Sequence, residues 1–400
     1  MTANTFDTDR SATGAGAPAG PAGGVVAGAA GGAAGGGGAW WLVGRGAAAL
    51  AGGMGIGRFA YTPILPMMHA QAGLSSRLGA TLATANYTGY LAGALAAIAV
   101  PRLLHSRWAL RLSMLILAVT LALMPLGRSG SLWLTLRLIA GIASALVFVI
   151  AVSAVLPRLH NHHVGWTFGG VGAGIALSGV VLASGNWRTA WWITALLTIA
   201  CTVPAWHLTG SPTPRAATRR TSSRHFNALL ASYTLEGIGY IIAGTFLVAA
   251  INETATGAVS NGAWIIVGLA ALPSTALWAW LSRSWSRSTL LLIALLLQAI
   301  GIALPTVIHG IAAALISAAL FGATFLGVAN LAIALGADLN IPHAIAILTT
   351  GYSLGQIIGP LAVGPLLHNG YHQALLVSAG VVALAAIAAL LVRHQPKELP

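Results

Sequence analysis

The sequence predicts an all-α membrane protein whose twelve transmembrane helices form two six-helix bundles. Three observations lead to this prediction: the composition, the spacing of the apolar segments, and a repeat between the two halves. Of the 400 residues, 57% are hydrophobic and only 6% are charged, and the mean hydropathy is +0.84. A water-soluble protein of this length needs several times as many charged residues to cover its surface. The composition therefore excludes a soluble globular protein and indicates a polytopic membrane protein.

Residues 1–38 form the first element, which we expect to be a disordered, Gly/Ala-rich cytoplasmic tail. The low-complexity stretch cannot bury enough apolar surface to offset the chain entropy lost on folding. Asp7 and Asp9 stand where a signal peptide carries basic residues, and no leucine-rich segment follows them. A cleaved secretory signal is therefore not expected here.

From residue 39 onward, apolar segments long enough to cross a bilayer alternate with short polar breaks. The expected spans are 40–67, 78–100, 108–127, 131–156, 164–184, 187–208, 227–250, 262–281, 288–307, 310–336, 343–367 and 371–392. They divide into an N-terminal bundle (39–208), a cytoplasmic central loop (209–226), a C-terminal bundle (227–393) and a short cytoplasmic tail (394–400).

Basic residues between the spans set the orientation in the membrane. If the N-terminus is cytoplasmic, fourteen Lys and Arg residues lie on the inner side and three on the outer side, while Arg58 and Arg137 fall within spans. The outer residues are Arg77, Arg128 and Arg188. We therefore expect a multi-pass protein of the bacterial inner membrane with both termini in the cytoplasm. The same distribution explains the net charge of +13 without nucleic acid, because the arginines do not gather on one face.

The two halves repeat each other in order. GIGRFA begins at Gly55 in span 1 and GIGYII at Gly237 in span 7, an offset of 182 residues; GWTFGG begins at Gly165 in span 5 and GYSLGQ at Gly351 in span 11. Six spans is an even number, so both halves start on the same side of the membrane. Parallel repeats of this kind are related by an axis along the membrane normal and enclose a site near the midplane. The pattern is typical of an alternating-access carrier.

These features resemble the major facilitator superfamily, and more narrowly its YbfB/YjiJ branch. The resemblance rests on GMGIGRFAYTPILPMM in span 1, EGIGYIIAGTFL in span 7 and GWTFGGVGAGIALSG in span 5, and it covers about residues 40–392. It implies a transporter of small organic solutes that works as a monomer.

Of two motifs typical of the superfamily, the chain keeps one. The loop after span 2, VPRLLHSRWALR, lacks the aspartate of the usual inner gate, so no gating ion pair is assigned. The glycine-rich motif of span 5 is present and favours export. Small residues let helices approach closely, and the glycines expected to do so are Gly53, Gly55, Gly57, Gly165, Gly169, Gly170, Gly174, Gly237, Gly239, Gly351 and Gly355.

Three charged residues lie within spans and away from their ends: Arg58, Arg137 and Glu236. Each costs on the order of 2.5–3.5 kcal/mol in a bilayer and usually faces a cavity or the bundle interior. By the repeat offset Glu236 corresponds to Met54, about one helical turn from Arg58. We therefore expect an Arg58–Glu236 pair in which Glu236 couples transport to protons.

Alternatives to that pair remain open. It could be a permanent structural salt bridge, or Arg58 could bind an anionic substrate with Glu236 as its counter-ion in the empty state. Arg137 either lines the cavity or extends outward to the membrane surface. Other polar and aromatic residues either line the substrate path or form hydrogen bonds between helices; they are Tyr61, Asn86, Tyr90, Tyr233, Tyr240, Asn330, Tyr352 and Gln356.

The predicted function is secondary transport of a small organic solute, coupled to protons because no ATP-binding motif is present. No nucleophile set or metal-ligand spacing occurs, so neither an enzyme nor a metal or other cofactor is expected; HNHH at 160–163 is interpreted as a surface loop. An uncoupled facilitator, and a receptor or scaffold that does not transport, remain as alternatives.

Overall fold

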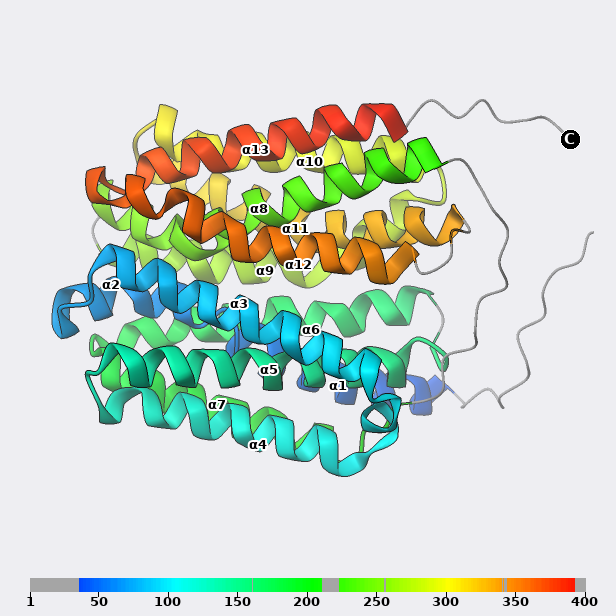
Figure 1. Cartoon of the computed structure of the whole chain (residues 1–400), viewed down its shortest axis with the longest axis horizontal. Coiled ribbons are helices and arrows are strands. Elements are labelled where there is room, and N and C mark those ends of the chain that lie inside the picture. Colours follow the sequence, from blue (N-terminus) through cyan, green and yellow to red (C-terminus); the bar gives the residue numbers. More distant parts are fainter. Residues whose placement is uncertain are drawn as a thin grey trace, which may run out of the picture. The chain divides into compact units, whose positions relative to one another are not determined.

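The computed structural model describes residues 36–159, 161–210, 223–254, 257–339, 341 and 344–392. These belong to one compact unit, Gly35–Pro400, and form helices joined by short turns (Figure 1). The α-helices are α1 Gly36–Leu50, α2 Tyr61–Ala72, α3 Ser76–Ala99, α4 Arg107–Leu123, α5 Gly130–Val155, α6 Asn161–Val180, α7 Trp187–Ala205, α8 Ser223–Thr254, α9 Gly257–Leu281, α10 Arg287–Val307, α11 Ile311–Asp338, α12 Ala344–Val363 and α13 Tyr371–Val392.

Polar residues in the short connections cap several of these helices. Ser75, Ser106 and Ser286 each accept a hydrogen bond from the backbone N–H three residues on, and Asn186 accepts two at the start of α7. Such caps satisfy backbone donors that a helix N-terminus leaves free. Gly73 ends α2 with φ +70°, a conformation that a side chain would strain. The polar breaks of the sequence are therefore the ends of the helices.

Span 1 is not a continuous α-helix. Between α1 and α2 the chain forms a π-helical turn, Ala51–Ile56, in which the N–H of Gly57 bonds to the carbonyl of Gly52 at 2.9 Å. The wider turn lies among close neighbours: a Cβ on Gly55 would lie 2.5 Å from the carbonyl oxygen of Val171 and 2.6 Å from the Cα of Gly174. π-Helical turns are rare and occur often at functional sites. This one ends at Ile56, two residues before Arg58.

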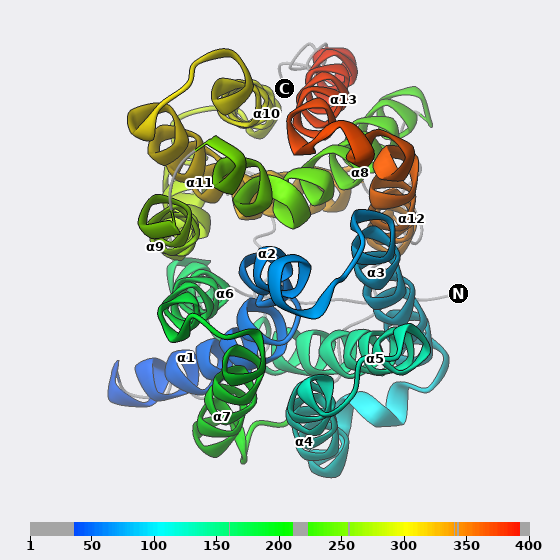
Figure 2. The same cartoon turned by 90° about the vertical axis from the view of Figure 1, so that its left-hand side faces the viewer.

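The helices group into two bundles, α1–α7 and α8–α13, which lie one above the other in Figure 1. Seen along the helices in Figure 2, three packings join the bundles: α6 with α9, α3 with α12, and α2 with α8. Residues 68–76 and the start of α13 lie at one end of the bundles, called here the His69 end. The start of α1 and the end of α13 lie at the other, called here the terminal end (Figure 1).

The all-helical membrane fold is confirmed, and each expected span coincides with one helix or, for span 1, with α1 and α2 together. Within the described residues, nine helices are long and apolar enough to cross a membrane by themselves. The other spans are α3, α7 and the interrupted span 1. The predicted tail was too long at one end, because α1 begins at Gly36; the rest of it, most of the central loop and the C-terminal tail lie outside the described residues.

Candidate functional site

Arg58 lies two residues after the π-helical turn, at the interface between the bundles. It is 3% exposed, and one terminal nitrogen donates a hydrogen bond to Oε1 of Gln356 on α12. Its guanidinium carbon lies 4.4 Å from the centre of the Tyr90 ring, 4.9 Å from that of Tyr87 and 5.5 Å from that of Phe59. Aromatic faces attract cations. Rings and one neutral amide therefore surround this charge, and no described carboxylate forms an ion pair with it.

Gln356 connects Arg58 to the C-terminal bundle. While its oxygen accepts from Arg58, its Nε2 donates to the hydroxyl of Tyr240 on α8 at 2.8 Å. Tyr240 is also the residue that the repeat pairs with Arg58. The structure thus brings three of the predicted path residues into one hydrogen-bonded chain across the interface.

Arg137 of α5 is a second buried cation beside the first. It is 1% exposed, so its side chain does not extend to the membrane surface. Its guanidinium carbon lies 4.8 Å from the centre of the Tyr61 ring, and its Nη2 donates a long hydrogen bond of 3.4 Å to the backbone carbonyl of Arg58. Nε and Nη1 of Arg137, and Nε of Arg58, have no hydrogen-bond partner in the structure. Asn86 donates to the backbone carbonyl of Arg137 at 3.0 Å.

Glu236 does not pair with Arg58, and the expectation of that ion pair was wrong. Glu236 is 1% exposed, and its Oε1 accepts a hydrogen bond of 2.8 Å from Gln298 on α10, while Oε2 has no partner. The repeat offset gave the depth of Glu236 along α8. It could not give the direction of the side chain around the helix axis, and that direction is toward α10 within its own bundle.

Aromatic rings line the C-terminal side of the interface as a continuous stack. Tyr233 and Tyr352 lie 4.3 Å apart and nearly parallel, Tyr352 lies 5.2 Å from Tyr240, and Tyr240 lies 6.1 Å from Phe325. Phe325 also contacts Phe59 of the N-terminal bundle at 6.0 Å. The three tyrosines were predicted path residues.

Two further predicted residues lie outside this aromatic stack. Tyr61 donates a hydrogen bond of 2.8 Å to the carbonyl of Gly79, a contact between helices. Asn330 of α11 is exposed and takes no part in the network.

The glycines chosen from the sequence lie at close helix contacts. A Cβ on Gly165 or Gly169 would meet the backbone of α9, one on Gly170 or Gly174 would meet α1 and the π-helical turn, and one on Gly237 would lie 2.4 Å from the carbonyl of Tyr352. The remaining glycines make equally short approaches: Gly53, Gly57, Gly239, Gly351 and Gly355.

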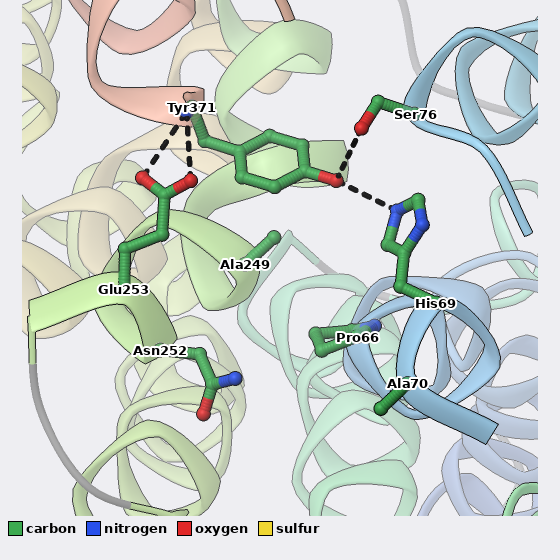
Figure 3. Close-up of a pocket in the computed structure, with 8 residues that line it drawn as sticks. All are labelled: Pro66, His69, Ala70, Ser76, Ala249, Asn252, Glu253 and Tyr371. Carbon is green, nitrogen blue, oxygen red and sulfur yellow. Dashed lines mark hydrogen bonds between the residues drawn. The ribbon is translucent and has the colours of Figure 1, made fainter. Parts of the chain in front are cut away.

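The His69 end contains a pocket of about 410 Å³ between the bundles, shown in Figure 3. His69 Nε2 of α2 lies 2.6 Å from the Tyr371 hydroxyl of α13, and Ser76 Oγ lies 3.4 Å from the same hydroxyl. Nδ1 of His69 bonds to the carbonyl of Leu74, so it carries the proton, and in the neutral ring Nε2 accepts from Tyr371. Both carboxylate oxygens of Glu253 accept from the Tyr371 N–H at 3.2 Å. We call this set of contacts, from His69 through Tyr371 to Glu253, the Tyr371 latch.

Sequence reasoning missed the latch. Glu253 was visible as one of six acids, but its placement at the N-terminus of α13 depends on how two distant helix ends meet. Histidine and tyrosine at the ends of spans are common, so no local signal marked them.

Span 1 and α8 are buried unequally along their length. Residues 49–65 of span 1 and 239–251 of α8 are buried at every position, whereas the parts of both spans nearer the terminal end alternate between buried and exposed. Near the His69 end, Thr62 bonds to the carbonyl of Gly244, and Tyr87 lies 2.9 Å from Thr245. α1 packs instead on α5, α6 and α7 of its own bundle.

The geometry agrees with the comparisons to known proteins. A family model described as "Uncharacterised MFS-type transporter YbfB" matches residues 50–390. Among solved structures, the chain is similar to one titled "Crystal structure of nucleoside transporter NupG (D323A mutant)", with a TM-score of 0.68 and 15% identity over 88% of this chain and 99% of that chain. At this identity the likeness shows the fold alone. No curated protein matches the chain in sequence.

Proposed function

Because the chain belongs to the family of MFS-type transporters that the YbfB model describes, we propose that it is a secondary active transporter. It moves a small organic solute across the bacterial inner membrane by alternating access and is coupled to protons. Both termini face the cytoplasm, which places the His69 end on the outer side. It functions as a monomer.

The observation that carries this proposal is the unequal contact between the bundles. Arg58 and Thr62 of span 1 donate hydrogen bonds to the C-terminal bundle at midspan and toward the His69 end, where His69 accepts one from Tyr371. α1 has its neighbours in its own bundle. Span 1 and α8, joined at one end and apart at the other while Thr275 of α9 stays hydrogen-bonded to Gly165 of α6 near the terminal end, correspond to one state of a carrier that rocks about a central site. The opposite state requires the Tyr371 latch to open.

Proton coupling is assigned to Glu236. Its unpartnered Oε2 lies in the protein interior, and no described cation forms an ion pair with it. An uncompensated buried carboxylate is unfavourable, and a bound proton removes that charge. Protonation of Glu236 would also weaken the hydrogen bond that it accepts from Gln298, because a carboxylate accepts an N–H more strongly than a carboxylic acid does.

The test uses full-length protein in liposomes with a pH-sensitive dye inside. A panel of nucleosides, sugars and small carboxylates is added, and both solute uptake and internal pH are followed. Glu236→Gln should abolish solute-driven proton movement while uptake down a solute gradient continues. Asp338→Asn, at an exposed carboxylate paired with Arg287, should behave like the wild type.

Each alternative has its own outcome. Solute uptake without proton movement in the wild type would indicate an uncoupled facilitator. Solute binding without uptake would indicate a receptor. Faster solute movement from the terminal side to the His69 side under a proton gradient would support export, which the glycine-rich α6 favours.

A further inference from the structure

We propose that Arg58 and Arg137 form the binding site for an aromatic carboxylate, the substrate class of this carrier. The inference rests on the proposed transport function and adds the chemistry of the solute.

The first argument is uncompensated charge. Two arginines, 3% and 1% exposed, lie close together in the membrane interior, where the guanidinium of Arg137 donates to the backbone carbonyl of Arg58. Glu236, the acid that lies within a span, is hydrogen-bonded to Gln298 instead. The ion pairs found among the described residues lie near helix ends and join Arg287 with Asp338 and His372 with Glu253. Buried arginine keeps its charge, and an unpaired buried charge is strongly unfavourable. An anion bound here would supply the counter-charge that the chain lacks.

The second argument is unused hydrogen-bond donors. Nε of Arg58, and Nε and Nη1 of Arg137, are buried without partners. A planar guanidinium presents paired N–H groups that match the two oxygens of a carboxylate. The present acceptor of Arg58 is the neutral amide oxygen of Gln356, and a carboxylate is the stronger acceptor for the same donors.

The third argument concerns the body of the ligand. The stack of Tyr233, Tyr352 and Tyr240 begins beside Arg58, because Gln356 connects Arg58 with Tyr240. Tyr352 is partly exposed within this stack. Parallel rings offer flat apolar faces on which another ring can stack. A planar aromatic acid fits both features, whereas a sugar acid would satisfy the arginines alone.

Binding at this place would also act on the interface. Arg58 follows the π-helical turn of the N-terminal bundle, and Gln356 belongs to α12 of the C-terminal bundle. A carboxylate that takes the Arg58 donors releases Gln356 and so breaks a hydrogen bond between the bundles. The ligand would therefore favour a different arrangement of the bundles, as a transported substrate must.

The test measures the thermal unfolding of purified full-length protein in detergent. The probes are benzoate, phenylacetate and indole-3-acetate, each with its matched amide and amine. We expect at least one carboxylate to raise the unfolding temperature of the wild type, and its amide and amine to do so less. Arg58→Gln should weaken that carboxylate at least tenfold. Arg45→Gln, at a partly buried arginine of α1 beside Trp41, is the matched control and should leave binding unchanged.

Arg58→Lys covers the case in which Arg58→Gln does not fold. It keeps the charge and loses the paired donors, so intermediate binding is expected. The proposal is overturned if no carboxylate stabilises the wild type more than its amide, or if carboxylate binding survives in both Arg58→Lys and Arg137→Gln at wild-type affinity. Proton-coupled uptake of a neutral solute would overturn the substrate class and leave the transport function standing.

Discussion

The hydroxyl of Thr62 donates a hydrogen bond to the backbone carbonyl of Gly244, a residue 182 positions further along the chain. That separation equals the offset between Gly55 and Gly237, so Gly244 is the counterpart of Thr62 in the second repeat. A residue can touch its own counterpart only where the two lie beside the axis that relates the repeats. The contact therefore locates the approximate two-fold axis between α2 and α8.

Arg58 precedes Thr62 by four residues, and its counterpart Tyr240 contacts the same Gln356. The two repeats therefore contribute different side chains, Arg58 and Tyr240, to one central site around Gln356. A site on the axis is reached equally from both bundles, which suits a carrier whose bundles move about it.

Close packing at Gly55 gives the first prediction. Gly55→Ala should destabilise the protein by about 1–3 kcal/mol, because the new Cβ would meet the backbone of Val171 and Gly174 rather than a flexible side chain. Gly44→Ala, where no atom lies within 4 Å, should be neutral or slightly stabilising through helix propensity. Thermal unfolding in detergent compares the two. Equal stability of both variants would contradict the close approach of α6 to the π-helical turn.

The Tyr371 latch gives the second prediction. Tyr371→Phe keeps the ring and removes the hydroxyl that bonds to His69, so the bundles should separate more often at the His69 end. A single cysteine at Ala249, which lines the pocket, should then react several-fold faster with a membrane-impermeant maleimide. Cys201 is first replaced by alanine. Unchanged labelling would mean that this hydrogen bond does not hold the end closed.

The pH dependence of the latch follows from His69, which lies beyond the apolar stretch 40–67. Burial lowers the pKa of His69 below its ordinary value, although the hydrogen bond to the Leu74 carbonyl acts in the opposite direction. The closed state thus favours the neutral ring. The neutral ring therefore stabilises the closed state above the ordinary histidine pKa of about 6.5. This stabilisation is lost as the pH falls from there toward the lowered pKa.

Labelling of the Ala249 cysteine should accordingly increase on acidification through this window. Glu253, His372 and Tyr371 are the other titratable groups around the pocket and its α13 end. His69→Gln leaves them in place and should remove the increase. If the increase persists in His69→Gln, another of these groups is responsible.

Gln356 gives the fourth prediction. Gln356→Glu places a carboxylate where Arg58 now meets an amide oxygen, which would form an ion pair between the bundles in a poorly hydrated place. The bundles should then separate rarely, and uptake should fall by at least tenfold while the unfolding temperature rises. Gln356→Leu removes the hydrogen bond without adding charge and serves as the comparison. Undiminished uptake in Gln356→Glu would show that the Arg58–Gln356 contact need not break during transport.

The sequence by itself determined the membrane class, the twelve spans, their ends and the duplicated order. Hydropathy, turn residues and repeat offsets are local properties, and local properties decide where a helix lies in a bilayer and where it stops. The same reasoning placed Arg58, Arg137 and Glu236 within spans, because a charge in an apolar segment stands out without any knowledge of its neighbours.

Only the tertiary structure decided what each of these charges contacts. The direction of a side chain around its helix axis, and the identity of the helix packed beside it, separate Glu236 from Arg58 and direct one to Gln298 and the other to Gln356. The π-helical turn likewise depends on how closely α6 approaches span 1. The Tyr371 latch joins residues about 300 positions apart, and nothing in the local sequence around either residue indicates that they are in contact.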